Sequence, residues 1–174
     1  MKELILGGVR SGKSRYAEQR ARESNLSVVC VATATALDGE MRARIRAHQE
    51  RRPASWTLVE TPRALAATLR AQAAPDRCLL VDCLTLWLTN LLCADDEDAF
   101  RAERAAFLKI LPTLPGRIIL VSNETNMGVI AASELARRFC DEAGCLHREL
   151  ASLCDRVVLT VAGLPLFLKG NAAS

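Results

Sequence analysis

The clearest chemical pattern in the sequence is GGVRSGKS at positions 7–14. It matches G-x-x-x-x-G-K-[ST] and stands between an apolar run and a helical stretch, as this phosphate-binding motif requires. In such a loop, backbone N–H groups and the start of the next helix surround phosphate oxygens. We expect Lys13 to reach the β- and γ-phosphates and Ser14 to hold Mg²⁺. The loop therefore predicts a nucleoside triphosphate ligand.

Two carboxylates stand at the ends of apolar strand-like runs. LLVD ends at Asp82, which we expect beside the nucleotide and its magnesium. IILVSNE ends at Glu124. Because open α/β sheets bind ligands at the carboxyl ends of their strands, Glu124 is a candidate metal ligand, substrate contact or base. A capping or helix-dipole role for Glu124 is equally open.

A histidine lies in the most basic stretch, RARIRAHQERRP at 42–53. On a helix, His48 shares a face with Arg44, Ile45 and Arg51, so it lies at an apolar edge flanked by guanidinium groups. A packing role is the simplest interpretation. Near a triphosphate, however, the arginines favour a neutral imidazole, which is a nucleophile. Attack on an α-phosphate would give a phosphoramidate and release pyrophosphate.

Composition narrows the class of protein. The 174 residues carry a net charge of +3, and the excess of lysine and arginine lies in residues 1–72, where an anionic ligand would bind. No aromatic residues are interleaved with the basic ones, so nucleic acid is not expected. No run approaches the roughly 20 apolar residues of a membrane span. We expect one cytoplasmic domain over residues 1–174.

The remaining polar residues suggest no second site. The seven cysteines form no CxxC pair and no metal-ligand spacing, so we expect reduced, mostly buried thiols. His147, beside Arg148 in a long helical stretch, has no phosphate context and is expected to be structural.

Apolar runs alternate with helical patterns along the chain. Strands are predicted at 3–6, 27–33, 55–60, 77–83, 117–124, 156–163 and 165–169. Helices are predicted at 13–23, 39–51, 61–72, 84–92, 97–111 and 133–154. Nearly all-apolar strands that alternate with helices indicate an α/β three-layer sandwich. Its central sheet is mostly parallel, and a C-terminal strand pair closes the chain.

Four segments together resemble a known family. They are GGVRSGKSRYAE, VATATALDGEMRARIRAHQERRPASWTLVETP, LLVDCLTLWLTNLL and ILVSNETNMGVI, in this order. The chain resembles the bifunctional adenosylcobinamide kinase/adenosylcobinamide-phosphate guanylyltransferases of cobalamin biosynthesis over nearly its whole length. The resemblance implies that ATP or GTP phosphorylates adenosylcobinamide. GTP then guanylylates a histidine, and adenosylcobinamide phosphate takes the GMP.

The resemblance also implies a set of site residues and an assembly. By position, His48 is the guanylylated histidine. The implied nucleotide contacts are Gly7, Gly8, Val9, Arg10, Ser11, Gly12, Lys13, Ser14, Ala32, Thr33, Ala34, Gln49, Glu50, Arg51, Arg52, Glu60 and Asp82. A RecA-like P-loop NTPase fold and a homotrimer are implied as well.

The sequence departs from the family pattern after the strand that ends at Glu124. Thr125 and Asn126 stand where Val-Gly is usual, and residues 129–131 replace Ile-Val-Pro. Two alternatives stay open. One is a simple small-molecule P-loop kinase in which His48 only packs or binds phosphate. The other is a nucleotide-switch or RecA-like binding module with slow hydrolysis.

Overall fold

A computed structural model describes residues 1–35, 39, 53–128 and 130–171. The predicted helix at 39–51, apart from Gly39, lies outside these residues. His48, Gln49, Glu50, Arg51 and Arg52 lie outside them too, so their roles stay predictions.

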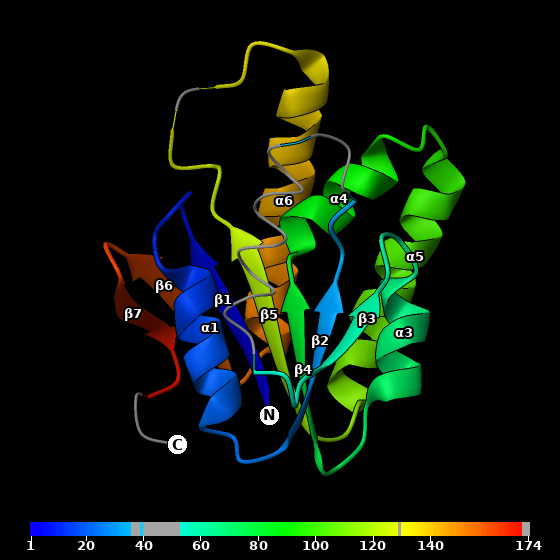
Figure 1. Ribbon diagram of the computed structural model, residues 1–174. Coiled ribbons are helices and arrows are strands. Elements are labelled where there is room, and N and C mark those ends of the chain that lie inside the picture. Colours follow the sequence, from blue (N-terminus) through cyan, green and yellow to red (C-terminus); the bar gives the residue numbers. More distant parts are fainter. Residues whose placement is uncertain (36–38, 40–52, 129, 172–174) are drawn as a thin grey trace.

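Seven strands form one sheet in the order β3-β2-β4-β5-β1-β6-β7 (Figure 1). All neighbouring pairs are parallel except β6 and β7, which form an antiparallel hairpin. The strands are β1 (Lys2–Gly7), β2 (Ser27–Ala32), β3 (Thr57–Glu60), β4 (Arg77–Asp82), β5 (Arg117–Asn123), β6 (Arg156–Val161) and β7 (Leu164–Lys169). The predicted mostly parallel sheet with a C-terminal strand pair is confirmed.

Helices connect the parallel strands. They are α1 (Lys13–Arg22), α3 (Leu65–Gln72), α4 (Leu84–Leu92), α5 (Glu97–Ile110) with a 3₁₀ turn η1 (Leu111–Thr113), and α6 (Glu134–Leu153). Side chains cap two of them: Asp96 accepts from the Ala99 amide at 3.0 Å, and Ser133 accepts from the Ala136 amide at 3.2 Å.

The predicted helix at 61–72 begins too early. Residues 61–64 are not helical, and α3 begins at Leu65. The Thr61 amide instead donates to the Ala32 carbonyl at 2.8 Å, which prolongs the β2–β3 pairing. The carbonyls of Pro62 and Arg63 accept hydrogen bonds from side chains of α4. Contacts between distant elements therefore override the helical pattern of this segment.

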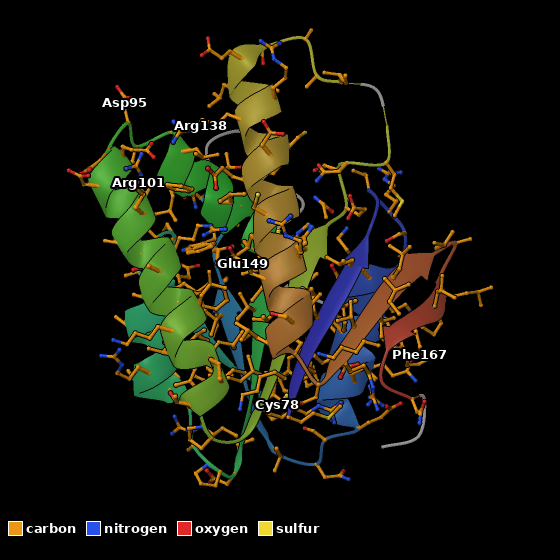
Figure 2. All side chains as sticks on the ribbon, turned by 180° about the vertical axis from the view of Figure 1, so that it is seen from behind. Cys78, Asp95, Arg101, Arg138, Glu149 and Phe167 are labelled. Atoms are coloured by element: carbon orange, nitrogen blue, oxygen red, sulfur yellow. The ribbon has the colours of Figure 1, made fainter. Side chains whose placement is uncertain are left out.

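The two faces of the sheet are covered unequally. Helices α3, α4, α5 and α6 pack on one face around the fully buried Trp87, whose ring contacts Phe107 edge-on with centroids 5.3 Å apart. Figure 2 views the molecule from behind and shows α5 and α6 side by side. Arg104 of α5 joins them through an ion pair with Glu149 of α6 at 3.0 Å. On the other face, α1 covers a smaller apolar cluster that includes Ile5 and Val121.

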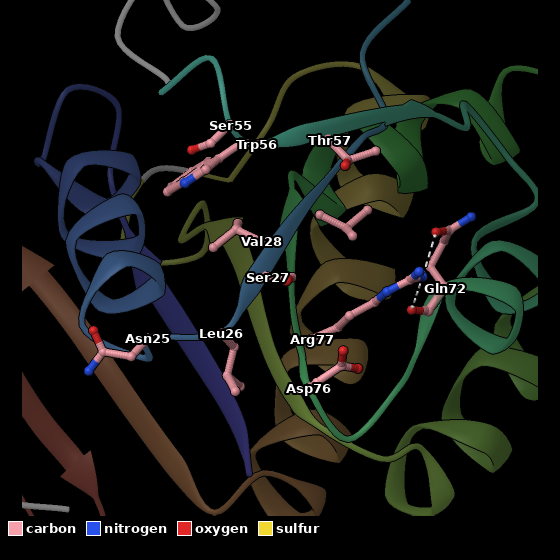
Figure 3. Close-up of a pocket in the computed structure, with 11 residues that line it drawn as sticks. Asn25, Leu26, Ser27, Val28, Ser55, Trp56, Thr57, Gln72, Asp76 and Arg77 are labelled. Atoms are coloured by element: carbon pink, nitrogen blue, oxygen red, sulfur yellow. Dashed lines mark hydrogen bonds between the residues drawn. The ribbon is translucent and has the colours of Figure 1, made fainter.

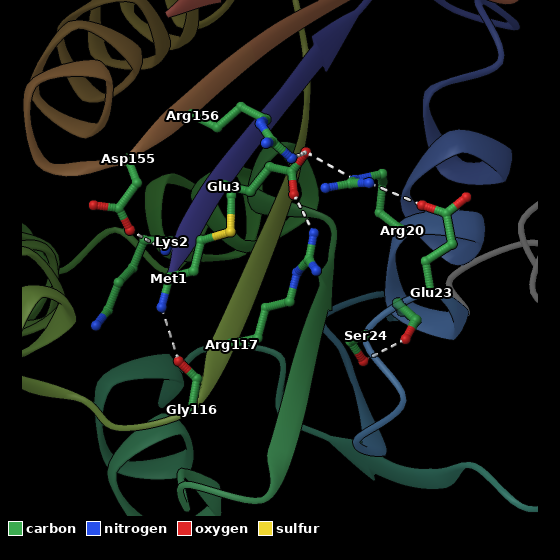
Figure 4. A network of polar contacts seen from close by, with 11 residues as sticks. Met1, Lys2, Glu3, Arg20, Glu23, Ser24, Gly116, Arg117, Asp155 and Arg156 are labelled. Carbon is green, nitrogen blue, oxygen red and sulfur yellow. Dashed lines mark hydrogen bonds and ion pairs between the residues drawn. The ribbon is translucent and has the colours of Figure 1, made fainter. Parts of the chain in front are cut away.

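A charged cluster lies at the amino edge of the sheet, where the strands begin (Figure 4). Glu3 is fully buried. Its carboxylate pairs with Arg117 at 2.9 Å, Arg20 at 3.4 Å and Arg156 at 3.6 Å. Arg20 also pairs with the exposed Glu23 at 2.8 Å. We call Glu3, Arg20, Arg117 and Arg156 the amino-edge cluster.

Two further expectations are tested by the fold. Among the described residues, no helix is long and apolar enough to cross a membrane. All seven cysteines are described and none forms a disulfide; only three are buried (Cys30, Cys78 and Cys154), while Cys93 and Cys145 are exposed. The prediction that most of the thiols are buried is wrong, and their reduced state stays a prediction.

Candidate nucleotide site

The phosphate-binding motif forms a closed loop between β1 and α1. The Ser11 amide donates to the Gly8 carbonyl at 3.2 Å, and Lys13 Nζ returns to the same carbonyl at 3.1 Å. Gly12 has φ of +94°, a conformation that favours glycine. A Cβ on Gly7 would lie 2.7 Å from the Thr160 carbonyl oxygen, so no side chain fits there. The two glycines let the backbone curve tightly, as phosphate binding requires.

The β6–β7 hairpin turn supports this loop from the side. The Gly163 amide donates to the Ser11 carbonyl at 2.9 Å. A Cβ on Gly12 would lie 3.0 Å from the Gly163 Cα, so the two backbones pack closely. Ala162 and Gly163 both have positive φ, as a two-residue hairpin turn requires. The sequence predicted the hairpin but contained no signal that its turn supports the phosphate loop.

Lys13 and Asp82 lie close enough to influence each other electrostatically. Burial lowers the pKa of Lys13, while Cys83 and Asp82 nearby act in the opposite direction. Burial raises the pKa of Cys83 to about 11, with a further contribution from Asp82. At neutral pH the Cys83 side chain beside Lys13 and Asp82 is therefore a neutral thiol.

The backbone after Asp82 is hydrogen-bonded to the side chain of Thr33, the residue that follows β2. Thr33 is buried; its hydroxyl donates to the Cys83 carbonyl at 2.6 Å and accepts from the Cys83 amide at 3.0 Å. Asn90 of α4 donates to the Thr33 carbonyl at 2.8 Å. The Thr33 hydroxyl is thus occupied by the backbone beside Asp82. Asn90 was missed as a site residue, although it stands in the VDCLTLWLTN block.

The sheet separates the predicted nucleotide contacts into two groups. Ala32 pairs with Glu60 on one side and with Asp82 on the other, so these three share the carboxyl edge. Glu60 is exposed, and β3 is four strands away from β1. At about 4.8 Å per strand, Glu60 lies roughly 19 Å from Gly7 across the sheet. Along the carboxyl edge, Glu60 is therefore farther from the phosphate loop than Asp82 is, and the nucleotide contacts of both residues stay predictions.

The predicted metal ligands fit magnesium by their chemistry. Ser14 is the second residue of α1, and Asp82 ends β4, two strands from β1. No group of three histidine, cysteine or acidic side chains among the described residues could hold a metal alone. Mg²⁺ in nucleotide sites takes one or two protein oxygens, and phosphates and water supply the rest. One hydroxyl and one carboxylate meet that requirement.

Glu124 also reaches the phosphate loop. Its amide donates to the Gly7 carbonyl at 3.0 Å, because β5 is paired with β1 and Asn123 is in register with Gly7. The buried His147 of α6 lies behind it, with Nδ1 3.7 Å from Glu124 Oε2. Burial lowers the pKa of His147, and Glu124 opposes that shift. The structure thus brings together Gly7, Lys13, Asp82 and Glu124 at the carboxyl edge.

A pocket lies elsewhere, at the amino ends of β2, β3 and β4 (Figure 3). Ser27, Thr57 and Arg77, each the first residue of its strand, line it. Arg77 donates to the Gln72 carbonyl at 3.1 Å and to its side-chain oxygen at 3.2 Å. This pocket is at the opposite edge of the sheet from the phosphate loop, so it is separate from the candidate site.

Solved structures with similar folds are distant in sequence. The ATPase EscN of the enteropathogenic E. coli type III secretion system aligns with a TM-score of 0.52 at 15% identity, covering 92% of this chain and 43% of EscN. A Pyrococcus horikoshii OT3 protein, Project ID PH0250, aligns with a TM-score of 0.53 at 11% identity. The alignment covers 99% of this chain and 87% of that protein. These likenesses support the P-loop NTPase-like α/β fold.

Sequence relatives are much closer. The chain is 62% identical over 171 residues to the bifunctional adenosylcobalamin biosynthesis protein CobP of Pseudomonas aeruginosa, covering 98% of this chain and 99% of CobP. It is 38% identical over 179 residues to CobU of Salmonella typhimurium, covering 95% of this chain and 98% of CobU. The family model for cobinamide kinase / cobinamide phosphate guanyltransferase matches residues 3–168. The chain belongs to the cobinamide kinase / cobinamide phosphate guanyltransferase family.

Proposed function

We propose that this chain phosphorylates adenosylcobinamide with ATP or GTP and then transfers GMP from GTP to the product through a guanylyl-histidine on His48. The observation that supports this most strongly is the phosphate loop with Lys13 and Asp82 at one edge of the sheet, in a chain that belongs to this family. Such an edge positions a triphosphate for attack, and catalysis of phosphoryl transfer consists mainly of positioning and charge stabilisation.

The two reactions differ in which phosphorus atom is attacked. In the kinase step, the substrate hydroxyl attacks the γ-phosphate and the nucleoside diphosphate leaves. In the guanylyl step, the His48 imidazole attacks the α-phosphate of GTP and pyrophosphate leaves. Lys13 stabilises phosphate charge in both reactions, and Ser14 and Asp82 would hold Mg²⁺, which would neutralise charge on the phosphate oxygens.

The guanylyl-histidine is tested with α-labelled GTP. The protein is incubated with the label and Mg²⁺, denatured, and analysed for bound radioactivity. We expect label that survives alkali and is lost in acid, and none in His48→Ala. GTP labelled at the γ-position is the matched control and should leave no label on the protein. Label that persists in His48→Ala would contradict the assignment, and γ-transfer without any α-label would indicate the simple kinase.

We also propose a cytoplasmic homotrimer. Strand β7 forms an edge of the sheet, and it exposes Leu164, Leu166 and Leu168 by 71%, 55% and 56%. An exposed apolar edge strand is typical of an interaction surface. Light scattering should give three times the chain mass of 19.0 kDa. A monomeric mass at micromolar concentration would contradict the trimer.

A further inference from the structure

The Glu124 carboxylate is held from two sides at the mouth of the candidate site. Its Oε1 atom accepts a hydrogen bond from the Asn126 amide at 2.7 Å. Its Oε2 atom lies 3.7 Å from His147 Nδ1, and the Glu124 side chain is only 14% exposed. One oxygen is therefore fixed by the backbone, and the other faces a buried imidazole.

His147 is anchored on its far side. Its Nε2 lies 2.8 Å from the hydroxyl of the buried Ser122, which in turn lies 3.4 Å from the Thr85 hydroxyl. Among the described residues, His147 Nδ1 makes no hydrogen bond. If Ser122 donates to Nε2, the single proton of the neutral ring is on Nδ1 and points to Glu124. A buried N–H without a partner is costly, so this arrangement favours a carboxylate at Oε2.

The turn that carries Glu124 is fastened to α6 by Asn126. Asn126 Nδ2 donates to the Cys140 carbonyl at 3.2 Å. A Cβ on Gly144 would lie 2.6 Å from the same nitrogen, so the small residue leaves room for the amide. Helix α6 thus supplies two of the contacts that fix this region, one through His147 and one through Asn126. Asn126 is also a position where the sequence departs from the family pattern.

Glu124 lies at the end of the strand between the phosphate loop and Asp82. Strand β5 lies between β1, which leads into the phosphate loop, and β4, which ends at Asp82. The Glu124 amide bonds to Gly7 at 3.0 Å. In the function we propose, a carboxylate between the loop and Asp82 would lie near the γ-phosphate and the incoming hydroxyl. This step rests on the proposed function.

We propose that Glu124 accepts the proton of the adenosylcobinamide hydroxyl in the kinase step, and that His147 is its positioning residue. The O–H bond breaks and its proton passes to Glu124 Oε2, while the hydroxyl oxygen forms a bond to the γ-phosphorus. The bond from the γ-phosphorus to the bridging oxygen breaks, and its electron pair leaves with the nucleoside diphosphate. Guanylylation needs no such base, because a neutral imidazole nitrogen already has a lone pair for attack.

The two reactions supply the test of Glu124. Glu124→Gln keeps the shape and loses the base, so transfer from γ-labelled ATP to adenosylcobinamide should fall about 10²- to 10⁴-fold. Labelling of the protein by α-labelled GTP should continue, which also shows that the variant is folded. Asp141→Asn, an exposed carboxylate on α6, is the matched control and should leave both reactions intact.

Other outcomes overturn the proposal. Glu124→Gln with wild-type kinase rates would show that Glu124 is not the base. Loss of both transfers would show that it holds the nucleotide or its metal instead. If the wild type gives kinase activity but no α-label, the guanylyl half of the proposed function fails, and the kinase rate of Glu124→Gln still decides the role of Glu124.

His147 is tested by separating kcat from KM. His147→Leu removes the hydrogen-bonding nitrogen, and we expect a lower kinase kcat with an unchanged KM for ATP. His147→Gln, which can still donate to Glu124, should recover part of that loss. A purely structural histidine would lower the melting temperature in both variants without this selective loss of kcat, and that result would overturn its positioning role.

Discussion

The two edges of the sheet use charge in opposite ways. At the amino edge, the buried Glu3 carboxylate pairs with three arginines, so its charge is compensated within the protein. At the carboxyl edge, Lys13, Asp82 and Glu124 lie around a backbone loop built for phosphate. The same strands begin in one region and end in the other. The amino-edge cluster uses its charges for contacts within the protein, whereas in the function we propose the carboxyl edge uses its charges to bind a ligand.

The largest expected effect is the loss of stability when the amino-edge cluster is disrupted. Glu3→Gln leaves Arg20, Arg117 and Arg156 close together without their shared carboxylate. Removing one member of a buried ion pair costs about 3–5 kcal/mol, which urea unfolding would measure. Specific activity per folded molecule should stay at the wild-type level.

The matched control for that change is Glu23→Gln. Glu23 pairs with Arg20 but is 45% exposed, so its loss should cost about 0–1 kcal/mol. Equal losses in the two variants would contradict a special role for the buried carboxylate.

The next largest expected effect is the loss of activity when a charge at the carboxyl edge is removed. Lys13→Ala removes the cation aimed at the phosphates, and both transfers should lose about 10²- to 10³-fold in kcat, as for other lost stabilising donors. The free energy of unfolding should hardly change, because within the described part of the chain Lys13 Nζ makes a single hydrogen bond, to an exposed loop carbonyl. Steady-state kinetics and urea melts on the same preparation measure both quantities. A Lys13→Ala variant that is fully active but less stable would contradict the proposed difference between the two edges.

A smaller effect concerns the support of the carboxyl edge. Thr33→Val leaves the amide and carbonyl of Cys83 without their hydroxyl partner, at a cost of about 1–3 kcal/mol. Thr113→Val removes an exposed hydroxyl bonded to the Ile110 carbonyl and should cost less. Thermal melts of the two variants separate these values. If Thr33→Val changes only the KM for the nucleotide, the Thr33 hydroxyl binds the ligand and does not support the backbone.

The smallest expected effect is a difference in reactivity between cysteines, which is measured without changing the activity. Burial raises the pKa of Cys83 to about 11 and that of Cys154 to about 12, so both remain thiols at pH 8. Only thiolates react readily with iodoacetamide, and the exposed Cys93 and Cys145 should therefore be modified first. Mass spectrometry of a time course tests this order. Equal rates at Cys83 and Cys145 would show that the carboxyl edge opens to solvent.

Local patterns predicted much of the fold. Each described strand lies within two residues of its predicted range, because apolar runs between turn residues are a local signal. The first turn of the predicted helix at 61–72 was wrong. The Thr61 amide is hydrogen-bonded to the neighbouring strand, and the carbonyls that follow accept hydrogen bonds from side chains of α4. Such contacts depend on strand order, which the pattern does not contain.

The candidate site was predictable to a similar extent. The phosphate loop and Asp82 are local motifs, and the structure places them together. The neighbours of Glu124 are not local: His147 follows it by more than twenty residues and approaches it only because α6 packs behind β5. The amino-edge cluster has the same origin, because Glu3 and Arg117 meet through the pairing of β1 with β5.

The most direct test of the two-edge account is the rise in melting temperature caused by Mg²⁺ and α,β-methylene GTP, which cannot transfer its nucleotidyl group. A ligand at about 100 times its Kd stabilises the folded state by about 2.7 kcal/mol. We predict that Glu3→Gln melts at a lower temperature than the wild type but shows the full rise. Lys13→Ala should melt like the wild type without nucleotide and show little rise. A full rise in Lys13→Ala, together with no rise in Glu3→Gln, would contradict the account.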